Sequence, residues 1–490
     1  MSDVDLLPDL AARRLGGMVL AANDEFFAPK ENLLKPEAPV FDPDRYTDRG
    51  KEMDGWETRR RRTPGHDWCV VRLGVPGIVR EVLVDTSFFR GNYPDRCSVE
   101  GAVLDGDDLA EARWVELVPE TALEGDAPNR FGVGTEARVT HVRLNIVPDG
   151  GVARLRVRGQ PLPDLRGAVG RDGSSELAGT ISGGVVVDAS DRFFSSPDNL
   201  IAPGDSSGMH DGWETRRRRG PGHDWVTVGL AAEAEVDRVE VDTTNFKGNY
   251  PDTCSVEASV GGDEWLEVVE RRALGPHGRF AFAVDPPVRA RFVRMNIHPD
   301  GGVARLRVFG RVTDDGWRAY GVSWVNAQAT EALERELVTC CGSSEWVRGM
   351  LEARPFADFD AVLERSDAVW AGLAPEAWLE AFAAHPRIGD REGSSWSRQE
   401  QSGTASAPED VRRALAEGNA AYEERFGHVF LINATGRSAS EMLEALQRRL
   451  ANDPETELAE AAEQQRQITR LRLVKLVRPP SLAPPASGGA

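Results

Sequence analysis

Apolar and polar side chains alternate at every second position in several segments of the first two-thirds of the chain. Examples are VREVLVDT (residues 79–86), ARVTHVRLNI (137–146) and VDRVEVDTT (236–244). This period is typical of strands that bury one face, and Gly, Pro, Asn and Asp separate the segments at short intervals. The pattern predicts antiparallel β-sandwiches of jelly-roll type, without amphipathic helices inside them.

The last third of the chain has a helical period instead. Three stretches place apolar residues three and four positions apart: ATEALERELVTCC (329–341), FADFDAVLERSDAVW (356–370) and PEAWLEAFAAH (375–385). Pro408 and Gly427 mark the start and end of a further helix, and Ser438 with Glu441 forms a capping box. A final helix is expected over about residues 455–477. The predicted fold class is therefore multidomain, with an all-α bundle after the β-sandwiches.

The β-rich region is a tandem duplication. DGWETRRRR occurs at Asp54–Arg62 and again, unchanged, at Asp211–Arg219. PGHDW, GNYPD and CSVE follow at the same spacing in both copies. NIVPDGGVARLRVRG (145–159) and NIHPDGGVARLRVFG (296–310) then complete the copies. Repeat one carries an insertion of ten residues before Asp54. Two tandem copies of one domain are expected, with length changes confined to loops.

Composition narrows the classes of partner. The 490 residues suggest about three domains, and a net charge of −20 argues against nucleic acid, because phosphate binding needs a basic face. No apolar run is long enough to span a membrane, and the N-terminus lacks a secretory signal. Five cysteines without a CxxC pair suggest reduced, buried thiols. We expect a cytoplasmic protein that binds neither nucleic acid nor membranes.

Charged residues gather at the repeated blocks. If WETRRRR is a strand, its pleat points Arg59 and Arg61 to one side and Arg60 and Arg62 to the other. One set could then face a ligand; the alternative is an edge strand protected by its charges. Polar residues at the expected strand ends and turns favour a site: Glu57, His66, Asp67, Asp85, Asn92 and Asp95.

The blocks GWETRRRR–PGHDW, GNYPD–CSVE and PDGG-ARLRV-G, each present twice, resemble the allantoicase family over about residues 15–312. The resemblance implies two galactose-binding-like jelly rolls that hydrolyse allantoate to (S)-ureidoglycolate and urea. The expected boundaries are repeat one at 15–160, a linker at 161–180 and repeat two at 181–312. Binding the carboxylate suits planar guanidinium donors, and expelling urea requires a proton donor.

These requirements suggest particular residues in both repeats. The catalytic candidates are Glu57, His66 and Asp67, with Glu214, His223 and Asp224 as their equivalents. The candidates for the substrate carboxylate are Arg59 and Arg61, with Arg216 and Arg218. Whether each repeat has its own site stays open. No cofactor is expected; a metal on His66, Asp67 and Asp85 is less favoured, since no HExxH motif supports it. His141 and His298 are not at equivalent positions and are expected to be incidental.

Two polar motifs interrupt the helical third. HPRIGD at His385–Asp390 predicts a turn after a helix, and SRQEQSG follows it. Ser397, Glu400 and Gln401 stand at i, i+3 and i+4 and so share one helical face. Such a face alone would usually meet solvent.

These motifs, with NAAYEERFGHVFLINATGRS (419–438) and ITRLRL (468–473), resemble the OHCU decarboxylase family over about residues 324–477. (OHCU is 2-oxo-4-hydroxy-4-carboxy-5-ureidoimidazoline.) The resemblance implies decarboxylation to (S)-allantoin without a cofactor, with His385 as the catalytic histidine and Glu400 beside it. It implies substrate contacts from Pro386, Ser397, Gln401 and Arg472, and from the main chain of 430–435. Asp390 stands where a small residue is common in the family.

Residues 313–323 are expected to link the domains, and 478–490 to be a disordered tail. Ureides are the expected partners, in a homo-oligomer. Two alternatives stay open: an allantoicase with a catalytically silent helical domain, and a non-enzymatic pair of jelly rolls that binds sugars or lipids.

Overall fold

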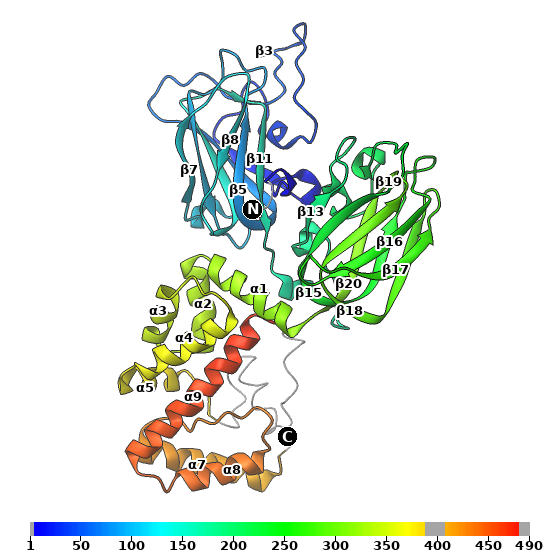
Figure 1. Ribbon diagram of the computed structural model, residues 1–490. Coiled ribbons are helices and arrows are strands. Elements are labelled where there is room, and N and C mark those ends of the chain that lie inside the picture. Colours follow the sequence, from blue (N-terminus) through cyan, green and yellow to red (C-terminus); the bar gives the residue numbers. More distant parts are fainter. Residues whose placement is uncertain (1–3, 388–406, 480–490) are drawn as a thin grey trace. The chain divides into compact units, whose positions relative to one another are not determined.

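The computed structural model describes residues 4–387 and 407–479 and divides into two compact units, residues 1–316 and 317–490 (Figure 1). The first unit contains the strands and a few short 3-10 helices, and the second is helical. The multidomain fold class predicted from the sequence is confirmed. Because the two units are separate bodies, each is described by itself.

Repeat one is a seven-stranded sheet folded into two layers. Its path runs β1-β5-β9-β6-β7, with β8 and β11 paired to β5. The register of β5 shifts between Arg72 and Gly77, so its first part pairs with β1 and β9 and its last part with β8 and β11. The strands are β1 Met18–Ala22, β5 Asp67–Asp85, β6 Arg96–Ala102, β7 Val115–Ala122, β8 Pro128–Gly132, β9 Arg138–Val147 and β11 Arg154–Pro161.

Repeat two has the same plan. Its sheet runs β12-β20-β15-β18-β16-β17, with β13 paired to β15. The strands are β12 Ser175–Glu176, β13 Val185–Ala189, β15 Asp224–Asp242, β16 Thr253–Ser259, β17 Leu266–Ala273, β18 Arg279–His298 and β20 Arg305–Val312. The alternating segments supply the cores, as expected: Val82 and Val84 of repeat one and Val239 and Val241 of repeat two are fully buried.

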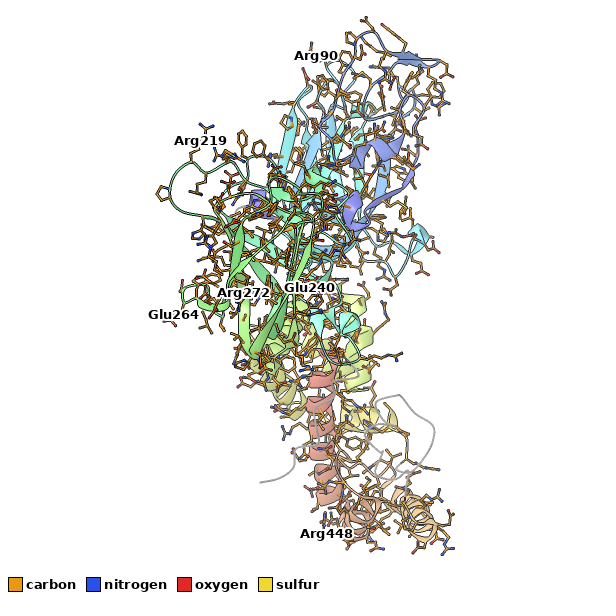
Figure 2. The ribbon with its side chains drawn as sticks, turned by 90° about the vertical axis from the view of Figure 1, so that its right-hand side faces the viewer. Arg90, Arg219, Glu240, Glu264, Arg272 and Arg448 are labelled. Atoms are coloured by element: carbon orange, nitrogen blue, oxygen red, sulfur yellow. The ribbon has the colours of Figure 1, made fainter. Side chains whose placement is uncertain are left out.

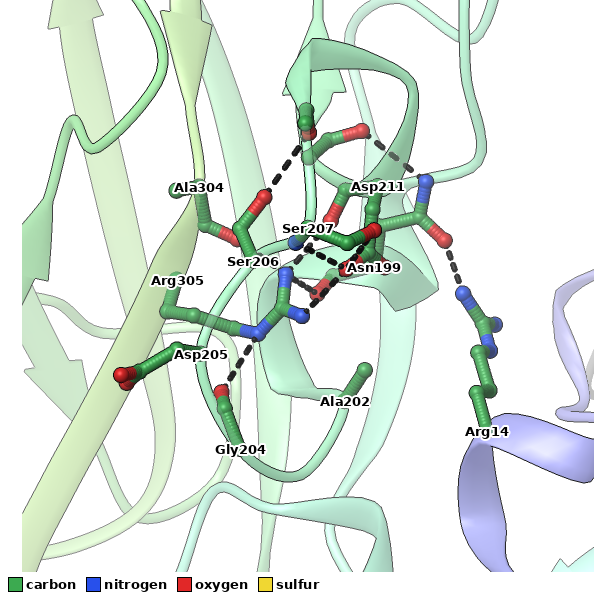
Figure 3. A network of polar contacts seen from close by, with 12 residues as sticks. Arg14, Asn199, Ala202, Gly204, Asp205, Ser206, Ser207, Asp211, Ala304 and Arg305 are labelled. Atoms are coloured by element: carbon green, nitrogen blue, oxygen red, sulfur yellow. Dashed lines mark hydrogen bonds and ion pairs between the residues drawn. The ribbon is translucent and has the colours of Figure 1, made fainter.

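One arginine in each repeat ties the DGWET block to the sandwich. In repeat two the guanidinium of Arg305 bridges to the Asp211 carboxylate at 2.8 Å and donates to the carbonyls of Asn199 and Gly204 (Figure 3). In repeat one Arg154, only 2% exposed, pairs with Asp54 at 2.6 Å. Burial alone would raise the pKa of the Asp54 carboxyl, but the hydrogen bonds from Arg154 and other donors outweigh this effect and lower the pKa to about 2. The aspartate of DGWET and the arginine that pairs with it therefore have a structural role in each repeat.

The strand expected over WETRRRR is shorter than predicted. Only the residue pairs Trp56–Glu57 (β4) and Trp213–Glu214 (β14) are strands. Each pairs with the short strand that directly follows PDG in its own repeat. These partners are Gly151–Val152 (β10) and Gly302–Val303 (β19). The arginines follow in irregular chain. Figure 2 shows Arg219, the last of the second set, on a loop that projects from repeat two. The strand pleat therefore does not sort these arginines.

The helical unit contains eight α-helices among its described residues. They are α1 Asp314–Ala327, α2 Thr330–Cys340, α3 Ser344–Glu352, α4 Phe359–Ala371, α5 Pro375–Ala383, α7 Glu409–Phe426, α8 Ala439–Arg449 and α9 Pro454–Leu476. The predicted capping box of Ser438 and Glu441 starts α8, and Gly427, at φ 76°, ends α7. Helix α1 occupies the segment expected to be the second linker.

All five cysteines are buried free thiols, in line with the expectation from their spacing. Within the described ranges, no helix combines the length and apolar character needed to cross a bilayer. Most of the predicted C-terminal tail, residues 480–490, lies outside the described residues.

Candidate functional sites

Three blocks of the repeated motif meet at one end of each sandwich. In repeat one, Glu57 of β4 pairs with Gly151, and the Gly151 amide donates to the Asn92 carbonyl at 2.7 Å. The Thr58 amide donates to the Gly150 carbonyl at 3.1 Å. The WET, GNYPD and PDGG blocks, far apart in sequence, therefore build one structure.

The two glycines of PDGG are required by this close approach. Gly150 has φ 139°, which only glycine adopts readily. A Cβ on Gly151 would lie 1.9 Å from the Phe89 ring, and one on Gly150 would lie 2.7 Å from the Asn92 carbonyl oxygen. Neither position has room for a side chain.

Glu57 lies in a cleft at this junction. Asn92 Nδ2 donates to Glu57 Oε1 at 2.7 Å. Burial raises the pKa of the Glu57 carboxyl, although the hydrogen bond from Asn92 opposes the shift. The cleft measures about 270 Å³, near the lower end of small-molecule sites. Its lining residues are Phe27, Phe41, Gly50, Lys51, Met53, Glu57, Phe88, Arg90, Gly91 and Asn92.

Repeat two reproduces the junction. Asn249 Nδ2 donates to Glu214 Oε1 at 2.6 Å, and the Gly302 amide donates to the Asn249 carbonyl at 2.7 Å. The Thr215 amide donates to the Gly301 carbonyl at 3.1 Å. The carboxylate–amide pair is therefore present twice in the chain.

The arginines predicted to bind a carboxylate already hold carboxylates of the protein. Arg59 pairs with Asp24 at 2.6 Å, and Arg61 pairs with Asp67 at 2.7 Å. In repeat two Arg216 pairs with Asp191 at 2.7 Å, and Arg218 pairs with Asp224. Arg59 and Arg216 are well exposed, whereas Asp67 and Asp224 are buried.

The two predicted histidines lie in different surroundings. His66 is exposed. His223 is half-buried and packs against His298, with ring centres 4.6 Å apart. Burial, with the nearby charges of Arg271 and His223, lowers the pKa of His298 to about 4. No hydrogen bond among the described residues joins His66 to Glu57.

Sequence reasoning missed the cleft residues Phe41, Lys51, Phe88 and Arg90. Phe41 and Lys51 belong to the insertion of repeat one. The insertion itself was the feature of the sequence that could have pointed to them. Over the described part of the chain, no group of three or more His, Cys, Asp and Glu side chains is arranged to hold a metal ion.

In the helical unit, His385 and Arg472 both lie near the C-terminal end of α2, at residues 339–342. His385 is half-buried just after α5, and its amide donates to the Phe382 carbonyl at 3.0 Å. Gly342 packs so closely on α5 that a Cβ there would lie 2.5 Å from Ala384 Cβ. Arg472 of α9 is buried and donates to the Thr339 carbonyl at 3.4 Å.

A buried polar network fixes the main chain of 430–435. Arg449 and Glu457, both almost fully buried, pair at 2.6 Å. Arg449 also donates to the Leu431 carbonyl, and Asn452 donates to Glu457 at 2.7 Å. The Asn433 amide donates to Gln464 Oε1 at 2.9 Å. Ser397, Glu400 and Gln401, with Asp390, lie outside the described residues.

Comparison with known proteins identifies both units. The allantoicase repeat family matches residues 8–162 and again 175–313, which is more than half of the chain. "Probable allantoicase" of Streptomyces avermitilis is 46% identical over 325 residues, covering 63% of this chain and 86% of the relative. "Probable allantoicase 1" of Burkholderia mallei is 47% identical over 318 residues, covering 62% and 94%.

The solved allantoicase of Saccharomyces cerevisiae is 35% identical and covers 62% of this chain and 92% of its own, with a TM-score of 0.55. The chain therefore belongs to the allantoicase family. The OHCU decarboxylase family matches residues 326–474. The protein is thus a fusion of an allantoicase and an OHCU decarboxylase domain, two enzymes of ureide catabolism.

Proposed function

We propose that the β unit hydrolyses allantoate to (S)-ureidoglycolate and urea in the cleft beside Glu57. The observation that carries this proposal is a partly buried carboxyl with a raised pKa, held by Asn92, at the junction of the repeated motifs. A carboxyl in this state can donate a proton near neutral pH more readily than an exposed one.

Proton transfer at Glu57 accounts for both halves of the hydrolysis. Protonated Glu57 donates to the ureido nitrogen, the C–N bond breaks, and urea leaves with the bonding electrons. The second ureido nitrogen stabilises the electron-poor carbon that remains. The Glu57 carboxylate then accepts a proton from water as the water oxygen bonds to that carbon. The net change is the addition of one water, and Glu57 ends protonated.

Urea release from allantoate by the purified full-length protein tests this proposal. Glu57→Gln removes the proton donor but keeps the size and a hydrogen-bond acceptor for Asn92. We expect kcat to fall by about a hundredfold or more, as for loss of a general acid. Undiminished urea release in Glu57→Gln would exclude Glu57 from the chemistry. His66, Asp67, Arg59, Arg61 and their equivalents in repeat two remain predictions for supporting roles.

We further propose that the helical unit decarboxylates OHCU to (S)-allantoin at His385. The placement of His385 and Arg472 near the C-terminal end of α2 supports this role, as does the fixed main chain of 430–435. The C–C bond to the carboxylate breaks, carbon dioxide leaves, and the electrons pass into the imidazoline ring and its carbonyl. The imidazole of His385 then transfers a proton to the ring carbon.

His385→Ala separates the two activities. Stereoselective formation of (S)-allantoin, followed by circular dichroism, should be lost while urea release from allantoate stays at the wild-type rate. If the wild-type protein forms no (S)-allantoin from OHCU, the helical unit is a silent assembly module instead. Glu400, Ser397, Gln401 and Pro386 remain predictions for the surroundings of the substrate.

A cytoplasmic homo-oligomer is part of the same proposal. Five buried free thiols suit a reducing compartment. Sedimentation of the purified chain measures the oligomeric state directly, and a monomer at micromolar concentration would contradict it.

A further inference from the structure

The insertion of repeat one forms one wall of the Glu57 cleft. Between Pro36 and Asp54 lie residues 37–53, whereas residues 204–210 alone separate Pro203 from Asp211 in repeat two. The extra chain forms a β-hairpin, with β2 (Tyr46–Thr47) paired to β3 (Gly50–Lys51). Phe41, Gly50, Lys51 and Met53 from this segment all line the cleft.

Several contacts hold this segment against the sandwich. The Phe41 ring stacks on Phe88, with ring centres 5.7 Å apart and planes at 19°. Arg49 Nη1 donates to the Phe26 carbonyl at 2.6 Å, and its guanidinium lies 5.0 Å from the centre of the Phe26 ring. Met53 is buried in a small cluster with Phe89. The wall is therefore attached at several points to the body of repeat one.

Phe88 has a backbone conformation that is costly for a bulky residue. Its φ is 70°, and its equivalent Asn245 has φ 74°. Asparagine tolerates this left-handed region much better than phenylalanine does. In repeat two Asn245 donates to the Ser206 carbonyl at 2.9 Å. Repeat one keeps an aromatic ring there, and that ring packs on the insertion and lines the cleft.

Lys51 supplies a positive charge to the cleft that forms no ion pair with any carboxylate of the described residues. Of the two cations that line the cleft, Arg90 donates from Nε to Asp126 at 2.9 Å and points outward (Figure 2). Lys51 Nζ instead lies 4.9 Å from the Phe41 ring centre and 5.9 Å from that of Tyr46. In the described part of the chain it forms no ion pair. A cation in this state is available to an anionic ligand.

Repeat two has no counterpart of this wall or of Lys51. Its phenylalanine pair, Phe193 and Phe194, is 65% and 60% exposed, against 40% and 37% for Phe26 and Phe27. Repeat two therefore keeps the Glu214–Asn249 pair but lacks the hairpin that lines the cleft beside Glu57.

We infer that the hairpin of repeat one completes one allantoate site per chain, in which Lys51 binds the substrate carboxylate. The inference rests on the proposed hydrolysis at Glu57 and names the group that orients the substrate there. Arg59 and Arg61, each engaged with an aspartate, are then not needed for the carboxylate. The Glu214–Asn249 pair of repeat two serves the shared framework.

Steady-state kinetics of urea release by the full chain test the role of Lys51. Lys51→Met keeps the length of the side chain and removes the charge. Loss of a charge-assisted contact is expected to raise KM for allantoate by about 10- to 100-fold, with kcat changed by less than about threefold. Lys51→Arg should recover most of the affinity. Lys247→Met, at an exposed lysine of repeat two, is the matched control.

An unchanged KM in Lys51→Met would overturn the assignment, and a raised KM in Arg59→Met would mean that the arginine binds the substrate carboxylate.

The number of sites is tested separately with Glu57→Gln. If about half of the wild-type rate survives in that variant, repeat two carries a second active site and the one-site inference fails. Calorimetric titration of Glu57→Gln with allantoate should give one equivalent per chain. Absence of urea release in the wild type would contradict the proposed function itself.

Discussion

The two repeats of the β unit have the same framework but different surroundings of the shared carboxylate. Both tie the aspartate of DGWET to a buried arginine and both hold a glutamate with an asparagine. In repeat one a hairpin, Phe27 and the stacked rings of Phe41 and Phe88 line a cleft at that glutamate, and in repeat two the phenylalanines equivalent to Phe26 and Phe27 are more exposed. The repeated motif therefore specifies the same framework in both repeats, while the residues around the glutamate differ.

The largest expected effect tests the shared framework. Arg154→Met and Arg305→Met each remove a buried guanidinium, so a half-buried aspartate loses its ion pair and several carbonyls lose a donor. Breaking a fully buried pair typically costs about 3–5 kcal/mol, which is the upper end of the loss expected here because the aspartates are partly exposed and keep other donors. Thermal or urea unfolding of the full chain should show a similar loss for both variants, and Arg219→Met, at an exposed arginine, should cost less than about 0.5 kcal/mol. A large loss in one repeat only would show that the frameworks are not equivalent.

A second pair of variants addresses the PDGG turn. Cβ atoms on Gly151 and Gly302 would lie about 2 Å from the rings of Phe89 and Phe246. Gly151→Ala and Gly302→Ala should each destabilise the β unit by about 1–3 kcal/mol or more, because the packed rings must move. Unfolding midpoints measure the loss, with Gly91→Ala, where a Cβ meets nothing within 4 Å, as the control. Wild-type stability of either variant would mean that the turn can relax.

Local patterns were enough to predict the architecture. The jelly rolls follow from alternation along β5 and β15, and the helix limits at Gly427 and Ser438 follow from local capping chemistry. Glu57 could be named as a candidate because it stands inside a motif that occurs twice, and its role stays a prediction. Each of these inferences depends on residues that are close in sequence.

What the sequence could not reveal depends on distant contacts. The chain leaves the strand after Glu57 because the Arg59 amide binds the Asp24 carboxylate and the Arg61 amide binds Asp149, 88 residues away. The alternation expected along WETRRRR could not reveal these two partners, because both are distant in sequence. Lys51 stands in a segment with no second copy to compare. Only the folding of the hairpin onto Phe26 and Phe88 brings it to the cleft.

The smallest expected effect tests whether the carboxylate–amide pair works differently in the two repeats. Asn92 opposes the rise in the pKa of Glu57, so Asn92→Ala should raise that pKa further. A general acid acts while it is protonated, so kcat falls as pH rises through its pKa, and the variant should move this falling limb to higher pH. The low-pH plateau should drop by less than about tenfold. Asn249→Ala should leave the limb in place, because urea release is assigned to the Glu57 cleft. A limb that moves to lower pH in Asn92→Ala, or moves equally in both variants, would contradict the distinction between the repeats.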